Sequence, residues 1–353
     1  MQSALRKMAG AVALACILFH CGCAPESTVW TEHEGYRSKA LVSGRGGGGF
    51  ERLSAKDTGL LAPNSVALDS VVANRHFMHG SGIAIGDVDH DAWPDIYVAR
   101  LTAPDVLYRN LGNWQFADIT EASGLPPDSF ASTGAVLADI DGDRDLDLLV
   151  TMLTGPNAVY LNDGQGRFAS APQAAGLASG NASTTMTLAD IDGDADLDIY
   201  VTRFKRLTLA DSLPHQLLTW DNVLADTSWN VRPEFRDHYV FRRSGSKIIR
   251  SELGEPDALY LNDGLGNYAL QPWVSGRFRD TYGMPITESP RHWGLTARFH
   301  DVNGDLILDL YVCNDFDSLD AFFLSQGDGV FRHVPPEVLR QTSNATMKLL
   351  QNA

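Results

Sequence analysis

The chain has 353 residues, with 44 Asp and Glu against 28 Lys and Arg, which gives a formal net charge of −16. Hydrophobic residues make up 44% of the chain, a normal share for a globular protein, so a wholly disordered chain is excluded. The acidic balance argues against nucleic acid as the main partner, because phosphate binding needs a basic surface. The length allows one large domain or two to three ordinary ones.

The first 23 residues resemble a secretory signal. Two basic residues precede the apolar run Met8–Phe19, which is too short to span a bilayer comfortably. The residues that follow resemble a bacterial lipoprotein cleavage box, with Cys21 as the expected lipidated residue and Cys23 as the alternative. Cleavage without lipid is a further alternative. In each case we expect export to the periplasm or the outer cell surface. Where a lipid is attached, we expect it to be the only membrane attachment.

Residues 24–49 are polar and end in a run of glycines, which predicts a flexible tether. A phosphate-binding loop is disfavoured there because no Gly-Lys-Ser/Thr sequence follows. Beyond the tether the only cysteine is Cys313, so residues 50–353 cannot form an internal disulfide framework.

The body of the chain contains internal repeats. Four segments align without gaps around an acidic loop, and a glycine-rich turn with a following aromatic residue comes after each of them. The runs beside the loops are short and rich in β-branched and aromatic residues, as in strands, and Asn-Asp-Gly is typical of hairpin turns. About fifty residues per four-stranded unit is the size of a propeller blade. The sequence therefore predicts an all-β fold, a β-propeller of four-stranded blades over residues 50–353. The aligned segments are Ile85–Val98, Leu137–Val150, Leu188–Val201 and Phe299–Val312.

Each acidic loop carries oxygen-bearing side chains at its first, third, fifth and ninth positions, and two loops add an aspartate at the seventh. Alternate residues of a tight loop can turn their oxygen atoms toward one point, and Ca²⁺ takes about six to eight oxygen ligands at roughly 2.3–2.6 Å. No Cys or His recurs in register, which disfavours zinc and copper. The sequence therefore predicts up to four Ca²⁺ sites. The candidate ligands are Asp87, Asp89, Asp91 and Asp95; Asp139, Asp141, Asp143, Asp145 and Asp147; Asp190, Asp192, Asp194, Asp196 and Asp198; and Asp301, Asn303, Asp305 and Asp309.

The charge of the loops supports a bound cation. Together they hold 17 carboxylates, slightly more than the whole net charge of −16, and these would repel one another without a counter-ion. Mg²⁺ is an alternative with stricter octahedral geometry, and Asp-rich surface turns that bind no ion are the other alternative.

These motifs together resemble the FG-GAP/VCBS repeats of integrin-α-like propellers, from about Phe50 to Phe331. The stretch from Trp293 to Asp315 is most similar to the cartilage acidic protein/UnbV-type group. The resemblance implies an extracellular, seven-bladed, calcium-binding propeller that mediates binding and adhesion, and it brings no catalytic residues.

The family usually has glycine at the sixth loop position, where this chain has a larger residue at positive φ, so we expect modest affinity for Ca²⁺. Asn303 makes the last loop the weakest expected site. The sixth-position residues are Ala92, Arg144, Ala195 and Leu306.

The chain is short for seven blades. Seven such units need roughly 360 residues, more than residues 50–353 supply. We count four complete units and the start of a fifth, and the sequence ends where another loop is expected. The propeller is therefore expected to be incomplete, and a truncated gene product without independent function is an alternative.

The long spacing before the last loop contains an insertion at about residues 203–256. Residues 203–250 carry nine Lys and Arg against five Asp and Glu, and Trp220 and Trp229 lie among them. This basic segment is a candidate surface for a protein or glycan ligand, with a degenerate blade or a packed irregular loop as alternatives.

For the protein as a whole, we expect an exported calcium-binding module for binding or adhesion. A propeller enzyme acting on polysaccharide is the alternative, but no His-Glu-x-x-His or Gly-x-Ser-x-Gly sequence supports it.

Overall fold

The computed structural model describes residues 30–33, 36–38, 49–63, 65–127, 131–171, 174, 176–177, 182–228, 230–244, 247–315 and 318–335. The chain divides into two compact units, Met1–Leu53 and Ser54–Ala353. The predicted signal segment with Cys21 and Cys23, and the expected fifth unit after residue 335, lie outside the described residues. None of the helices in the described part of the chain has the length and apolar character needed to cross a bilayer.

The first unit contains a short hairpin where we expected only a tether. β1 (Thr31–His33) pairs with β2 (Tyr36–Ser38) in antiparallel register. The Arg37 guanidinium lies over the Trp30 ring, 4.8 Å from its centroid. The hairpin is a local feature that a composition argument does not detect, because alternation over three residues is too short to recognise.

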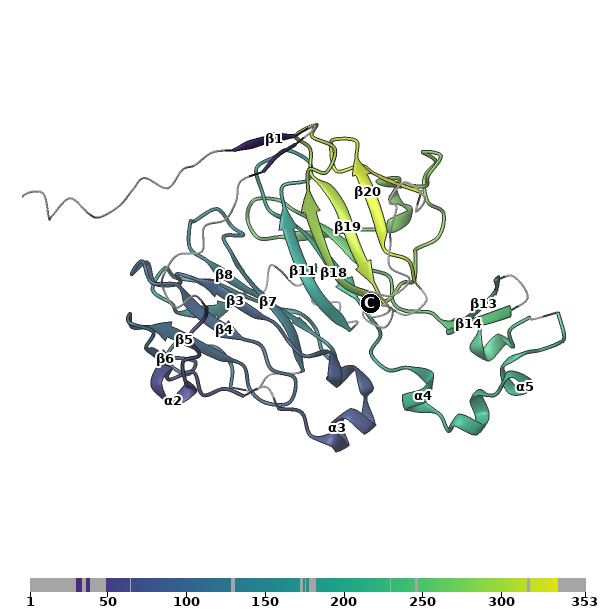
Figure 1. Cartoon of the computed structure of the whole chain (residues 1–353), viewed down its shortest axis with the longest axis horizontal. Coiled ribbons are helices and arrows are strands. Elements are labelled where there is room, and N and C mark those ends of the chain that lie inside the picture. Colours follow the sequence, from purple (N-terminus) through teal and green to yellow (C-terminus); the bar gives the residue numbers. More distant parts are fainter. Residues whose placement is uncertain are drawn as a thin grey trace, which may run out of the picture. The chain divides into compact units, whose positions relative to one another are not determined.

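The described part of the second unit contains four sheets in which four antiparallel strands pair side by side, and a fifth strand joins the last of these sheets (Figure 1). This confirms the predicted all-β fold of four-stranded blades. The first blade consists of β3 (Ile83–Gly86), β4 (Asp95–Val98), β5 (Val106–Asn110) and β6 (Phe116–Asp118), and the second of β7 (Ser132–Ala138), β8 (Asp147–Met152), β9 (Ala158–Asn162) and β10 (Phe168–Ser170). The third consists of β11 (Ser183–Ala189), β12 (Asp198–Arg203), β15 (Ala258–Asn262) and β16 (Tyr268–Gln271), and the fourth of β18 (Gly294–His300), β19 (Asp309–Asn314), β20 (Ala321–Ser325) and β21 (Phe331–His333), with β17 (Phe278–Arg279) parallel to β21.

The blades stack through both faces of their sheets. β3, β7, β11 and β18 lie beside one another in that order. In β8, Leu148 packs in the core shared with the first blade and Leu149 in the core shared with the third, and both are fully buried. Successive side chains of a strand point to opposite faces, so a run of apolar residues here means a sheet covered on both sides.

A Gly-Leu pair recurs after the aromatic residue of the glycine-rich turns, as in Phe116…Gly124-Leu125 and Phe168…Gly176-Leu177, and it joins one blade to the next. A Cβ atom added at Gly124 would lie 3.0 Å from the carbonyl oxygen of Phe168 in the next blade, tighter than ordinary contact. Cβ atoms added at Gly59 and Gly176 would lie even closer to the carbonyl oxygens of Phe116 and Tyr268. The glycines are therefore needed because the connecting segment and the outermost strand of the following blade approach too closely for a side chain.

The insertion between β12 and β15 is a helical and hairpin excursion and not a degenerate blade. It contains α4 (Leu209–Ser212), η3 (His215–Leu218), α5 (Trp220–Val223), η4 (Pro233–Phe235) and the paired strands β13 (Tyr239–Ser244) and β14 (Lys247–Glu252). Leu209, Leu218, Val223 and Tyr239 form its own small core. The remaining short helices of this unit are α2 (Ala55–Thr58), α3 (Leu68–Ala73), η1 (Arg75–His79) and η5 (Trp273–Ser275).

Candidate metal centre

The four acidic loops occupy the same place in the four blades. Each connects the first strand of its blade to the second, and its ninth residue is the first residue of that second strand. The loops are residues 87–95, 139–147, 190–198 and 301–309. The gapless repeat of the sequence is therefore a repeat in structure.

The ninth-position aspartate anchors each loop to its sheet. Asp147 is fully buried and accepts hydrogen bonds from the backbone N–H groups of Ile140, 3.1 Å away, and Asn162, 2.9 Å away. Burial raises the pKa of Asp147 and of Asp198 to about 6, and raises that of Asp95. Each of the other ninth-position residues, Asp95, Asp198 and Asp309, likewise accepts two backbone N–H groups, one from its loop and one from the third strand of its blade.

The first-position aspartate curls the loop. Asp139 accepts the N–H of Gly142 at 2.8 Å and that of Arg144 at 3.0 Å. The sixth residue then takes positive φ in all four loops, as the missing glycine predicted, and an L-residue there carries steric strain. The φ values are 71° at Ala92, 78° at Arg144, 74° at Ala195 and 68° at Leu306.

In three loops the carboxylates converge. Three carboxylate oxygens of each set lie within 4.8 Å of one another, and two ligands bound at roughly 2.3–2.6 Å to one ion can be about that far apart. One oxygen of Asp192 is buried without a hydrogen-bond partner among the described residues. Burial and neighbouring carboxylates raise the pKa of Asp141 and of Asp192. The donors are all oxygen atoms, so the three sets fit a hard divalent cation. The sets are Asp87, Asp89 and Asp95; Asp139, Asp141 and Asp147; and Asp190, Asp192 and Asp194.

Other candidate ligands stand outside these sets. In the last loop the third position is Asn303, which donates to Asp305 at 2.9 Å, and no set of three carboxylates forms there among the described residues. The seventh-position aspartates lie against the glycine-rich turns of their own blades, Asp145 against Gly164 and Asp196 against Gly264. A Cβ atom added at either glycine would clash with the carboxylate. The remaining candidates outside the sets are Asp91, Asp143 and Asp198.

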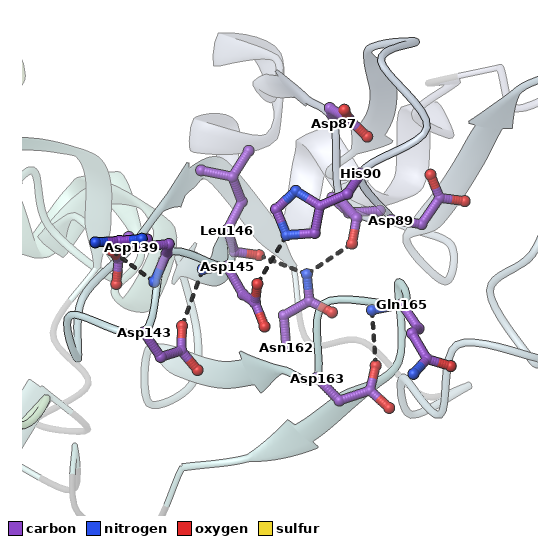
Figure 2. Close-up of polar contacts among 12 residues, drawn as sticks. Asp87, Asp89, His90, Asp139, Asp143, Asp145, Leu146, Asn162, Asp163 and Gln165 are labelled. Carbon is purple, nitrogen blue, oxygen red and sulfur yellow. Dashed lines mark hydrogen bonds and ion pairs between the residues drawn. The ribbon is translucent and has the colours of Figure 1, made fainter.

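Two cationic side chains at the first loop were not singled out from the sequence. Arg109 of β5 places its Nη2 atom 2.6 Å from Asp89 Oδ2 and 3.1 Å from Asp91 Oδ2. His90 reaches from the first loop to the second, with its Nε2 atom 2.8 Å from Asp145 Oδ1 (Figure 2). A sequence signal existed for each, since Arg109 replaces the leucine of the other turns and His90 the glycine of the other loops.

Each of the first three loops is also held by the blade that follows it. Asn162 donates from its side-chain amide to the carbonyl oxygen of Val88, 2.8 Å away, and Asn262 does the same to Ile140 at 2.8 Å. The backbone N–H of Gly329 donates to Ile191 at 3.0 Å. The second residue of a loop is thereby fixed by the glycine-rich turn of the next blade.

Three tyrosine–aspartate pairs, each with a buried aspartate, account for further recurring acids. The Tyr97 hydroxyl donates to Asp105 at 2.7 Å, and the Tyr200 hydroxyl donates to Asp257 at 2.9 Å. Tyr311 donates to Asp320 at 2.8 Å. Each aspartate also accepts a backbone N–H from the end of the second strand of its blade. These acids therefore stabilise the connection between the second and third strands, and their role is structural.

The comparisons with known proteins agree with this geometry. A model of FG-GAP-like repeats matches residues 87–150 and 139–201, which contain the first three acidic loops. The chain therefore contains FG-GAP-like repeats. Cartilage acidic protein 1 of Mus musculus is 28% identical over 150 residues, 40% of this chain, and that of Xenopus tropicalis is 27% identical over 154 residues, 42% of this chain. The matches span only 22% and 23% of those relatives, and they confirm the resemblance to this group.

Two solved structures are also similar to this chain, each at 16% identity. A lectin from Agrocybe aegerita that recognises non-reducing terminal N-acetylglucosamine aligns with 70% of this chain and 63% of its own, with a TM-score of 0.26. The Vibrio cholerae biofilm matrix protein Bap1 aligns with 76% of this chain and 40% of its own, with a TM-score of 0.33.

Proposed function

We propose that this protein is an exported calcium-binding module whose stacked blades support a rigid binding surface for a protein or glycan ligand. The observation that carries the proposal is the convergence of three carboxylates in each of three successive FG-GAP blades. FG-GAP repeat proteins are generally binding or adhesion modules.

The role of the ion in this proposal is structural. Ca²⁺ bound in a loop would neutralise carboxylates that otherwise repel one another. The chain supplies the rest of the rigidity. Asp147 ties its loop to β9 through Asn162, and the Asn162 side chain ties that strand to the loop of the preceding blade. A loop fixed at one blade is thus coupled to its neighbour.

Calorimetric titration of the chelated protein with Ca²⁺ tests this function. We expect binding with dissociation constants between about 10⁻⁶ and 10⁻³ M, and an increase in Tm. The double variant Asp141→Asn, Asp192→Asn should lose most of that heat. Its matched control is Asp163→Asn, Asp263→Asn, because both of these exposed aspartates lie in the glycine-rich turns outside the loops. No heat and no Tm shift in the wild type would overturn the metal assignment.

For the ligand surface we propose the basic excursion between β12 and β15. Trp220 is 39% exposed and lines a groove together with Asp221, Leu224 and Arg232. An exposed aromatic ring beside charged groups is suited to protein and glycan contacts. Binding of the wild type and of Trp220→Ala to a glycan array and to cell-surface extracts would compare the two ligand classes. Equal binding by both proteins would remove the excursion from the proposal.

Export and lipid attachment complete the proposed function. Metabolic labelling with a fatty acid in a bacterial host would test Cys21 against the alternative Cys23. We expect the Cys21→Ala variant to lose the label and its membrane association. An unchanged label in Cys21→Ala together with a lost label in Cys23→Ala would move the attachment site to Cys23, and no label in the wild type would refute lipid attachment.

A further inference from the structure

The first acidic loop already contacts a positive charge of the protein itself. The Arg109 guanidinium lies 2.6 Å from Asp89 Oδ2, and Asp89 belongs to the converging set of this loop. The same Nη2 atom lies 3.1 Å from Asp91 Oδ2. These carboxylates, together with Asp95, raise the pKa of Arg109. One nitrogen therefore bridges the third and fifth positions of the loop, two of the positions whose oxygens we expect to bind the cation.

The corresponding position of every other blade is apolar. Arg109 pairs with Ala117 on the outermost strand, and in the same register Leu161 pairs with Ala169, Leu261 with Ala269 and Leu324 with Arg332. Among the described residues, no Lys or Arg forms an ion pair with the carboxylates of the second or third loop. The difference between the first loop and the next two is thus one leucine-to-arginine exchange at one strand position.

A second side-chain contact also distinguishes the first loop. His90 stands at the fourth position of the first loop, where the other loops have glycine, and its Nε2 atom lies 2.8 Å from Asp145 Oδ1 of the second loop (Figure 2). This contact joins the loops of the first and second blades directly. The first loop is therefore held by Arg109 within its own blade and by His90 toward the next one.

We propose that Arg109 takes the place of the cation in the first loop, so that this loop is ordered without metal and Ca²⁺ binding is confined to the loops of later blades. This inference rests on the proposed calcium function. It also assigns different roles to repeats that look alike in sequence. The acidic loop of the first blade is ordered without metal, and the acidic loops of the second and third blades become ordered when they bind Ca²⁺.

Hydrogen–deuterium exchange of the full chain, in Ca²⁺ and in chelator, tests the inference loop by loop. We expect Ca²⁺ to slow exchange in the second and third loops at least about tenfold, and to change the first loop by less than about twofold. Equal slowing in the first and second loops would overturn this inference and leave the proposed function standing. No slowing in any loop would overturn the proposed function and this inference together.

Substitution at the same register position provides the second test. Arg109→Leu copies the residue of the other blades, so we expect the first loop to respond to Ca²⁺ and the calorimetric stoichiometry to rise by about one ion per chain. Arg167→Leu is the matched control, since Arg167 pairs at 3.0 Å with Asp163 outside the loops, and its stoichiometry should equal that of the wild type. An unchanged stoichiometry in a folded Arg109→Leu protein would contradict the role assigned to Arg109.

Discussion

Asn162 donates a hydrogen bond from its side-chain amide to the carbonyl oxygen of Val88, 2.8 Å away, and so joins the turn of the second blade to the acidic loop of the first. The backbone N–H of the same residue donates to the buried carboxylate of Asp147. One asparagine therefore connects the acidic loops of two successive blades. Because Asn262 repeats both contacts in the third blade, the loops form a linked series and not a set of separate turns.

Removing this amide should weaken the stack. We expect Asn162→Ala to lower the free energy of unfolding by about 1–2 kcal/mol, because the substitution leaves the Val88 carbonyl without its partner. Asn267→Ala is the control, since Asn267 binds only the exposed Asp263, and it should cost less than about 0.5 kcal/mol. Urea unfolding of the wild type and the two variants measures both values. An equal loss of unfolding free energy in Asn162→Ala and Asn267→Ala would show that the inter-blade hydrogen bond contributes no more to stability than the exposed one.

The ninth and fifth loop positions should differ in what they stabilise. Asp198 is fully buried and accepts the N–H groups of Ile191 and Asn262, so Asp198→Ala should cost about 2 kcal/mol or more even in chelator. Asp194 is exposed and accepts the N–H of Asp196. Asp194→Ala should change stability in chelator by less than about 0.5 kcal/mol and yet reduce the Tm gain from Ca²⁺. A full Ca²⁺ gain in Asp194→Ala would remove that residue from the site.

The Ca²⁺ effect should depend on pH. In the metal-free protein the pKa of Asp147 and of Asp198 is about 6, above the ordinary 3.8. Their contribution to stability is therefore fully present below pH 4 and is lost as the pH rises through 6, where both carboxylates ionise without a partner cation. Ca²⁺ bound in the set that contains Asp147, or in the set that lies beside Asp198 in the third loop, would favour the ionised carboxylates, so the Tm difference between Ca²⁺ and chelator should grow from pH 5 to pH 7. A difference that is constant across this range would contradict the role of these two acids.

A buried histidine should make the fold sensitive to acid. His76 is 2% exposed, packs edge-on against Phe204, and neither ring nitrogen has a hydrogen-bond partner among the described residues. Burial lowers the pKa of His76 to about 4, so the folded chain binds fewer protons than the unfolded chain between pH 4 and 6.5. Stability is lost as the pH falls through that window, by roughly 2 kcal/mol at pH 5 from this group.

Replacing the ring nitrogens tests that source of acid sensitivity. His76→Phe should show a smaller loss of unfolding free energy between pH 7 and pH 5 than the wild type, by roughly the same 2 kcal/mol. The exposed His215 offers the control, and His215→Phe should follow the wild-type profile. Parallel pH profiles for wild type and His76→Phe would place the acid sensitivity elsewhere.

The repeats made the blades predictable. The acidic loops and the Asn-Asp-Gly turns define two of the three strand connections within a blade. β8 shows why the blades must stack, since Leu148 and Leu149 need covered faces on opposite sides of the sheet. The positive φ at Arg144 also followed from the sequence, because the loop needs a left-handed residue at the position where glycine is missing.

Other features depend on contacts that no repeat encodes. The pairing of His90 with Asp145 joins different blades and exists only once their stacking is known. Arg109 reaches Asp89 because β5 presents that position toward its own loop, which a one-residue change in a motif does not reveal. The insertion between β12 and β15 was expected from the repeat spacing, but its helices were not, because helices of four residues, such as α4 and α5, are too short for a recognisable period.

The central claim is that the acidic loops bind Ca²⁺, and a crystal structure of the full chain grown with Ca²⁺ tests it most directly. We expect one ion in the second loop, bound by Asp139, Asp141 and Asp147, and one in the third loop, bound by Asp190, Asp192 and Asp194, with oxygen distances of roughly 2.3–2.6 Å. Carboxylates turned apart toward solvent, with only water between them, would contradict it.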